Sequence, residues 1–224
     1  MRILVVAALA SVASVQAAGV SGQGSWETTL QARDIDHDGT VDAYYDTDQD
    51  ITWLADANFA MSSGYDTNSP PYAPGAMDWA TASHWAQTLD LHGVEGWRLP
   101  TAFLPSGCTQ TSFSCANAPS EMSRLFEHAL GGANNTGPFT GIGLDTMYWT
   151  GTLFSYQDFG GPQRTLGFSF VDGSGGDTDE LSLPLYAWAV HDGDIAAAVP
   201  EPQTYALLLA GIGLVVAATR RKRR

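Results

Sequence analysis

The order of segments along the chain predicts an α+β domain in which two helices pack on short antiparallel strands. A strand-like segment comes first and two stretches with helical spacing of apolar residues follow. Short strand candidates separated by glycine-rich turns then complete the domain. Seven Trp, eight Tyr and 24 Gly indicate aromatic packing among tight turns, which is typical of an ordered domain.

The first strand candidate is residues 44–54, where aromatic and β-branched residues partly alternate with polar ones. Asp46, Asp48 and Asp50 are interpreted as one polar face of this strand. A metal loop would need glycine after them, and the β-branched Ile51 stands there instead. The last strand candidates are MYWTGTLF (147–154), TLGFSFVD (165–172) and LYAWAVHD (185–192).

Two helices are expected between these strands. Residues 78–91 predict the first, with Asp78 as its N-cap and Gly93 ending it. Residues 120–130 predict the second, with Ser120 as its N-cap and a glycine pair after it. Their core-facing side chains are Trp79, Ala82, Trp85, Ala86 and Leu89 in the first, and Met122, Leu125, Phe126 and Ala129 in the second.

The motif GWRLPT (96–101) predicts a short strand that Pro100 ends. Arg98 lies between Trp97 and Leu99, two residues expected in the core. A guanidinium in that position needs a buried carboxylate partner, so a structural ion pair is favoured over ligand binding.

The N-terminus has the pattern of a secretory signal peptide over residues 1–17. Arg2 precedes an apolar run from Ile3 to Ala13, and a small-x-small cleavage site follows. The alternative is a buried N-terminal strand.

The C-terminus combines an apolar segment with a cationic end. The uninterrupted apolar run spans only 14 residues, 205–218, whereas a comfortable membrane span takes about 17 to 25. We assign a hydrophobic transmembrane helix to 204–219. The cations at 220–224 are expected to stay cytoplasmic, which leaves residues 18–199 outside the inner membrane.

Residues 200–224 closely resemble the PEP-CTERM sorting signal of Gram-negative bacteria, because a Pro-Glu-Pro, a short apolar helix and an Arg cluster follow in order. The resemblance implies recognition at Pro200, Glu201 and Pro202 by exosortase, a membrane cysteine transpeptidase. The protein would then sit transiently in the inner membrane before release to the cell surface or extracellular matrix. The alternative is a plain tail anchor. In that case the mature protein would still carry the Arg cluster, and its intact mass would show this.

Processing makes the working domain strongly acidic. Cleavage of the signal peptide removes Arg2, and cleavage of the C-terminal signal removes five cations and Glu201. The processed domain then contains four arginines and 23 acidic residues, which gives a net charge near −19. Such a surface repels phosphate backbones and anionic lipids, which excludes nucleic acid as an expected partner. Cations, neutral glycans and basic partners remain.

The two cysteines, Cys108 and Cys115, are separated by six residues. In an oxidising compartment this pair is expected to form a local disulfide that pins a long loop. The spacing does not favour redox chemistry or zinc binding.

Seven segments follow one another in the domain at 26–194, which a linker at 195–199 follows: DITWLADAN (50–58), MDWATASHWAQTL (77–89), GWRLPT (96–101), SEMSRLF (120–126), NTGPF (135–139), YWTGT (148–152) and YAWAVHDGD (186–194). In this order they resemble the family typified by the C-terminal domain of the Legionella collagen-like adhesin. The resemblance implies a C-type-lectin-like fold and a role in surface adhesion or glycan binding. His191 stands where that family usually carries Arg, and the acidic charge does not favour a sulfated ligand.

The motif most typical of a metal-binding site is DIDHDGTVD, residues 34–42. Oxygen ligands at alternate positions around a glycine suit a calcium ion, which takes six to eight oxygens. Tyr45 stands where an EF-hand has its bidentate Glu, so the motif resembles the nine-residue calcium loops of extracellular domains. The expected ligands are Asp34, Asp36, Asp38, Thr40 and Asp42; the alternative is a solvated acidic turn.

A weaker cation-loop candidate is DGSGGDTDE (172–180), which also fits a solvated hairpin. The catalytic motifs of hydrolases, zinc proteases and nucleotide-binding enzymes are not found in the sequence. We therefore expect a non-enzymatic binding or structural protein of the cell envelope or polysaccharide matrix, stabilised by calcium. The alternative is a polysaccharide-modifying enzyme that uses paired carboxylates.

Overall fold

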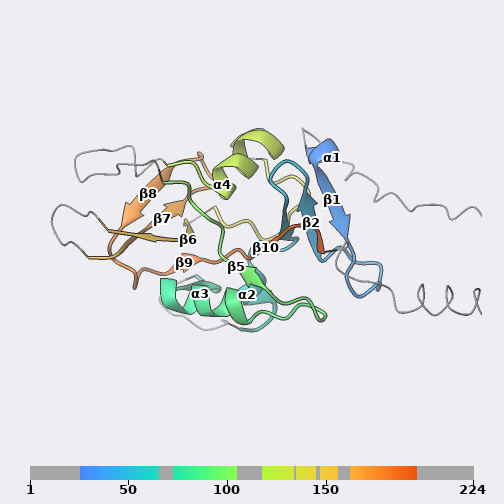
Figure 1. Ribbon diagram of the computed structural model, residues 1–224, viewed down its shortest axis with the longest axis horizontal. Helices are drawn as coiled ribbons and strands as arrows, with labels where there is room; N and C mark the ends of the chain where they lie inside the picture. The colour runs from blue at the N-terminus through green and yellow to red at the C-terminus, as the bar shows by residue number, and fades with distance from the viewer. Residues whose placement is uncertain are drawn as a thin grey trace, which may run out of the picture.

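The computed structural model describes residues 26–65, 73–104, 118–133, 135–144, 147–155 and 162–195. Within these ranges, ten strands form two five-stranded sheets, with short helices at their junction (Figure 1). The predicted N-terminal signal helix (1–17) and the predicted C-terminal hydrophobic helix (204–219) lie outside the described residues, as do the two cysteines.

The first sheet has the order β1-β2-β3-β10-β5, and all neighbouring strands in it are antiparallel. Its strands are β1 (Leu30–Arg33), β2 (Ala43–Asp46), β3 (Ile51–Leu54), β5 (Trp97–Arg98) and β10 (Val190–Asp192). The long connection between β1 and β2 is the acidic loop 34–42, so the sheet fixes both ends of that loop.

The second sheet has the order β4-β9-β6-β7-β8. Its pairs are antiparallel except β6 with β9, and a register shift interrupts β6 between Trp149 and Leu153. Its strands are β4 (Ala76–Met77), β6 (Tyr148–Phe154), β7 (Arg164–Phe168), β8 (Gly175–Thr178) and β9 (Leu185–Tyr186).

The helices are short, and the α+β, C-type-lectin-like fold class predicted from the sequence is wrong. The described part of the chain is mainly β, and α3 is the one helix there that exceeds two turns. The expected second helix stops being α-helical after its first turn. The helical elements are α1 (Trp26–Thr29), α2 (Phe59–Ser62), α3 (Trp79–Thr88), α4 (Glu121–Arg124) and the π-helix η1 (Leu125–Ala129).

Both predicted helix starts are confirmed. The Asp78 side chain accepts a hydrogen bond from the Thr81 backbone N–H at 2.8 Å. Ser120 forms a reciprocal capping box with Ser123. The first helix ends at Thr88, earlier than expected from Gly93.

The core is built on tryptophans shared by the two sheets. Trp53, Trp97, Trp149 and Trp188 are each no more than 1% exposed. Trp188 packs edge-on against Trp53, with ring centroids 5.0 Å apart, and against Phe139 at 4.9 Å. Its indole N–H donates to the Leu54 carbonyl at 2.9 Å, which joins the segment between β9 and β10 to the first sheet.

Two of the expected single strands are pairs. Residues 44–54 form a hairpin, because residues 47–50 turn and Asp50 takes a positive φ of 54°. Residues 185–192 contribute β9 to one sheet and β10 to the other. The aspartates at 46, 48 and 50 therefore do not form one strand face, as the sequence had suggested.

The two longest helical segments lie at the junction of the sheets. Trp79 of α3 donates its indole N–H to Thr150 on β6 at 2.8 Å, and α3 also packs beside β5. Phe126 of η1 contacts Phe168 of β7, with ring centroids 5.8 Å apart. Figure 1 shows α3 and α4 on opposite sides of the molecule.

Candidate functional site

The acidic loop 34–42 joins two paired strands, and the pairing of Arg33 with Ala43 closes it. The Asp42 backbone N–H donates to the Arg33 carbonyl at 2.9 Å. Arg33 itself is 7% exposed and holds Asp194 through two hydrogen bonds of 2.7 and 2.8 Å. The ends of the loop are therefore fixed by the sheet and by a nearly buried ion pair.

The carboxylates of the loop turn inward and accept backbone N–H groups. Asp34 accepts from Asp38 at 3.1 Å and from Gly39 at 3.0 Å, and Asp36 accepts from Asp38 at 3.1 Å. Asp42 accepts from the Ile35 N–H at 2.7 Å, across the mouth of the loop. These bonds orient the carboxylates before any ligand is present.

A tight backbone turn makes this convergence possible. Gly39 has φ of 93° and the neighbouring His37 has φ of 63°. An added Cβ at Gly39 would meet no atom within 4 Å, so backbone conformation alone explains the glycine here. The Thr40 N–H donates to Asp38 at 2.7 Å, and this bond lowers the pKa of Asp38. Asp38 is thereby held in the ionised form that a cation needs.

The four predicted carboxylate ligands fall into two overlapping groups. Thr40, the fifth predicted ligand, donates its N–H to Asp38. One carboxylate oxygen from each of Asp34, Asp36 and Asp38 lies within 4.8 Å of the other two. Asp42 does not join this trio; it forms a second group of the same span with Asp36 and His92. Asp36 is common to both groups, so the loop brings four predicted carboxylates together around it.

His92 is the member of the site that sequence reasoning missed. Its Nδ1 lies 3.4 Å from Asp36, and its Nε2 lies 3.5 Å from Asp42. The residue belongs to the turn between Leu91 and Val94, 50 positions beyond the loop. No local pattern in the sequence links a histidine in a turn to a distant acidic loop, so only the fold reveals this contact.

The donor set fits a hard divalent cation. Asp34, Asp36 and Asp38 supply the alternate carboxylates of a calcium loop, and they are half-buried to exposed, so water can complete the coordination. The second group, with its imidazole, could also accept a borderline cation. Within the described ranges these are the two clusters of carboxylate and imidazole groups with metal-binding spacing.

The other acidic candidates have different roles. The buried Asp46 accepts hydrogen bonds from the Asp48 N–H and from the Gln49 side chain, both at 2.9 Å, and so supports the β2–β3 turn. Asp172 accepts from the Ser174 N–H and hydroxyl in the turn between β7 and β8. Each is a hairpin turn stabilised by its own aspartate.

Arg98 has the carboxylate partner that its position next to Trp97 requires. Its guanidinium donates two hydrogen bonds of 2.8 Å to Glu121 and also contacts Asp192. Burial by itself would lower the pKa of Arg98, but the hydrogen bonds to the two carboxylates raise it. Arg98 therefore links β5 to α4 and β10. Its neighbours Trp97 and Leu99 are buried in the core, and the Pro100 carbonyl accepts from the Gly151 N–H on β6 at 2.8 Å.

Two further sets of predicted residues lie outside the described residues. These are the proposed disulfide of Cys108 with Cys115 and the sorting residues Pro200, Glu201 and Pro202. In the part of the chain that the structure covers, none of the helices has the length and apolar character needed to cross a bilayer.

Comparison with known protein families supports the prediction of a sorting signal at the C-terminus. Residues 198–224 match the model of the PEP-CTERM protein-sorting motif. No curated protein and no solved structure matches the chain. The expected relation to the collagen-like adhesin domain has no support from these comparisons. The sorting motif supports a protein that is exported, processed at the membrane and sorted by exosortase.

Proposed function

We propose that this chain is a non-enzymatic binding or structural component of the cell envelope or extracellular polysaccharide matrix, and that calcium stabilises its folded domain. The sorting motif supports delivery to that location. The convergence of Asp34, Asp36 and Asp38 within 4.8 Å is the observation that carries the calcium role.

Like charge is the physical reason that calcium would stabilise the fold. Several ionised carboxylates within a few ångströms repel one another, and a divalent cation converts this repulsion into attraction. Asp34 and Asp42 lie beside the paired ends of β1 and β2, so ligation would hold the first hairpin closed. The domain, with a net charge near −19 after processing, would also lose part of its general self-repulsion.

The matrix role is supported by the same charge. A strongly acidic domain bearing a calcium site can meet neutral polysaccharide without electrostatic cost, and it can meet acidic polysaccharide through bridging calcium. Nucleic acid and anionic lipid surfaces offer no comparable attraction.

The test is co-sedimentation of the purified protein with exopolysaccharide from its own host, in calcium and in chelator, beside a reducing-sugar assay. Binding in calcium without release of reducing ends is the expected result. Release of reducing ends would establish a polysaccharide-cleaving enzyme instead. Failure to bind in either condition would reject a polysaccharide-binding role and leave a structural one.

A further inference from the structure

The segment α4–η1 forms a ridge with a hollow on each side. The first hollow, about 380 Å³, lies toward the β7–β8 hairpin, and the second, about 360 Å³, lies toward the β2–β3 turn. Both volumes fall within the range of small-molecule sites, about 300 to 1,000 Å³. Arg124 and His128 line both hollows, so the two are parts of one surface.

Arg124 differs from the other three arginines of the processed domain. Arg33, Arg98 and Arg164 each pair with at least one carboxylate at 2.8 Å or less. In the described part of the chain, Arg124 has no carboxylate partner, and its guanidinium stacks over the Phe103 ring at 4.6 Å. Its planar face is therefore held while its N–H donors stay available to a ligand.

The second hollow offers hydrogen-bond acceptors opposite that donor. It is lined by Asp46, which is 1% exposed, and by Asp48 and Gln49. The Gln49 amide oxygen is buried without a hydrogen-bond partner. A buried acceptor left unpaired costs free energy, so a ligand O–H directed at Gln49 would remove that cost.

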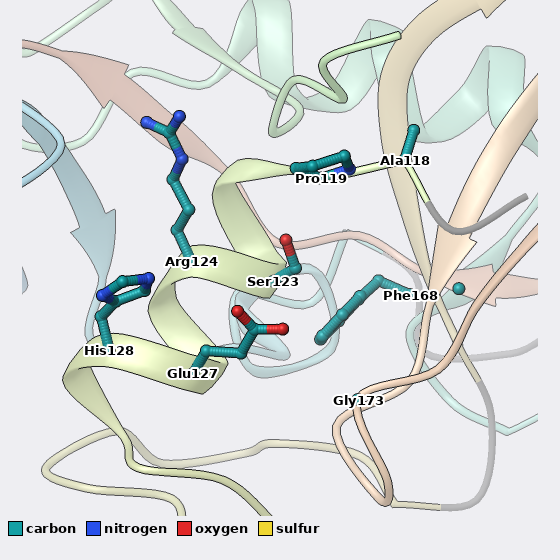
Figure 2. Close-up of a pocket in the computed structure, with 9 residues that line it drawn as sticks. Ala118, Pro119, Ser123, Arg124, Glu127, His128, Phe168 and Gly173 are labelled. Atoms are coloured by element: carbon teal, nitrogen blue, oxygen red, sulfur yellow. The ribbon is translucent and has the colours of Figure 1, made fainter. Parts of the chain in front are cut away.

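The first hollow has both polar and apolar walls. Figure 2 shows Ser123 and Glu127 projecting from the helix toward Phe168, while Arg124 and His128 extend on the other side. The exposed carboxylate of Glu127 is a further acceptor, and the ring of Phe168 with Pro119 supplies an apolar surface. Each hollow therefore places hydrogen-bond acceptors beside the shared donor, Arg124.

This combination selects a neutral ligand with many hydroxyl groups. Carboxylates and a free amide oxygen require O–H donors, and Arg124 requires acceptor oxygens. A sugar hydroxyl serves as both donor and acceptor. An anionic ligand would meet Asp46, Asp48 and Glu127 as well as the domain's negative charge. The same carboxylates would attract a cationic ligand, but an ammonium or guanidinium group cannot accept the hydrogen bonds that Arg124 donates.

We propose that the two hollows flanking α4–η1 bind a neutral oligosaccharide that crosses the ridge, with Arg124 as the central donor and Gln49 and Glu127 as acceptors. The inference rests on the proposed matrix role and assigns that role a binding surface. It does not involve the calcium loop.

The test separates exopolysaccharide of the host into neutral and acidic fractions by anion exchange. Binding of each fraction to the purified protein is measured by calorimetry in calcium. The variants are Arg124→Gln and Glu127→Gln. Their matched controls are Arg164→Gln and Glu180→Gln, which change residues of the same types outside the two hollows.

We expect the unaltered protein to bind the neutral fraction. Arg124→Gln should weaken that binding about tenfold or more, because hydrogen bonds from a charged donor are lost. Glu127→Gln should weaken it several-fold, and both controls should stay within about twofold. Melting temperatures measured on the same samples establish that each variant is folded.

Three results would overturn the inference: no binding of the neutral fraction, binding of the acidic fraction alone, or full binding by Arg124→Gln. The proposed matrix role is judged separately, from retention of the unaltered protein on unfractionated exopolysaccharide. If Arg124→Gln is retained there as well as the unaltered protein, the matrix role stands and this surface is not its site.

Discussion

The ion pair of Glu121 with Arg98 gives a prediction whose magnitude follows from the structure. The Glu121 side chain is 9% exposed and accepts two hydrogen bonds from Arg98 at 2.8 Å and one from the Thr101 N–H at 2.7 Å. Glu121→Ala removes all three of these hydrogen bonds, and Arg98 keeps weaker ones to the Leu99 carbonyl and the Thr101 hydroxyl at 3.1 and 3.2 Å. The remaining carboxylate partner of Arg98, Asp192, is 77% exposed and therefore screened by water.

Removing one partner of a buried ion pair costs about 3 to 5 kcal/mol, and the lower end applies because Arg98 is itself 28% exposed. We expect the free energy of unfolding to fall by about 3 kcal/mol. With an urea m-value of about 2 kcal/mol/M, the denaturation midpoint should fall by about 1.5 M. Urea titration followed by tryptophan fluorescence measures this change.

Asp192→Asn is the matched control, because it changes the exposed partner of the same arginine. It should cost less than about 1 kcal/mol. Equal effects of the two substitutions would refute the reasoning that burial of Glu121 decides the energy. A loss below about 1 kcal/mol in Glu121→Ala would show that the guanidinium is solvated in the folded domain.

Two further substitutions probe the hairpin turn and the core. Burial raises the pKa of Asp46, so the folded state favours the protonated form of this side chain. The contribution of Asp46 to the free energy of unfolding is therefore most favourable below the pKa of the unfolded state, and it is lost as pH rises through the pKa of the folded state. Asp46→Asn should therefore be at least as stable as the unaltered protein at pH 7, with a flatter dependence of the urea midpoint between about pH 4 and 7. A large loss at pH 7 would contradict this. Trp188→Leu should cost about 3 kcal/mol or more, because a fully buried indole in contact with both sheets is lost; a thermal shift of less than about 3 °C would contradict it.

The sequence predicted local features well where one residue type determines the geometry. The aspartate before α3 and the serine before α4 cap their helices because each side chain reaches an N–H within one turn. The alternate carboxylates of the acidic loop converge because Gly39 permits a positive φ. Each of these features depends on fewer than ten consecutive residues.

The fold class was not predictable in the same way. Residues 185–192 have the composition of one strand, yet Trp188 enters the core between the sheets and the chain changes sheet there. Residues 125–129 have helical spacing but adopt a π-helix, because their packing against β7 and α1 decides the local geometry. In both segments distant contacts override the local preference.

The candidate site could be predicted only in part from the sequence, because some of its contacts join residues that are far apart in the chain. The sequence places Asp34, Asp36, Asp38 and Asp42 at ligand spacing, but the contact with His92 depends on a turn 50 residues away. The hollows beside Arg124 are assembled from two hairpins, β2–β3 and β7–β8, and from the segment α4–η1 with Ala118 and Pro119 before it, so no single stretch encodes them.

Thermal melting in calcium and in chelator tests the central claim most directly. A ligand at about 100 times its dissociation constant stabilises by about 2.7 kcal/mol, which corresponds to about 5 to 10 °C for a domain of this size. The protein should melt higher by this amount in calcium. Asp36→Asn should remove most of the shift because Asp36 belongs to both ligand groups, whereas Asp48→Asn should retain it. Identical melting of the unaltered protein in calcium and in chelator would contradict the calcium site.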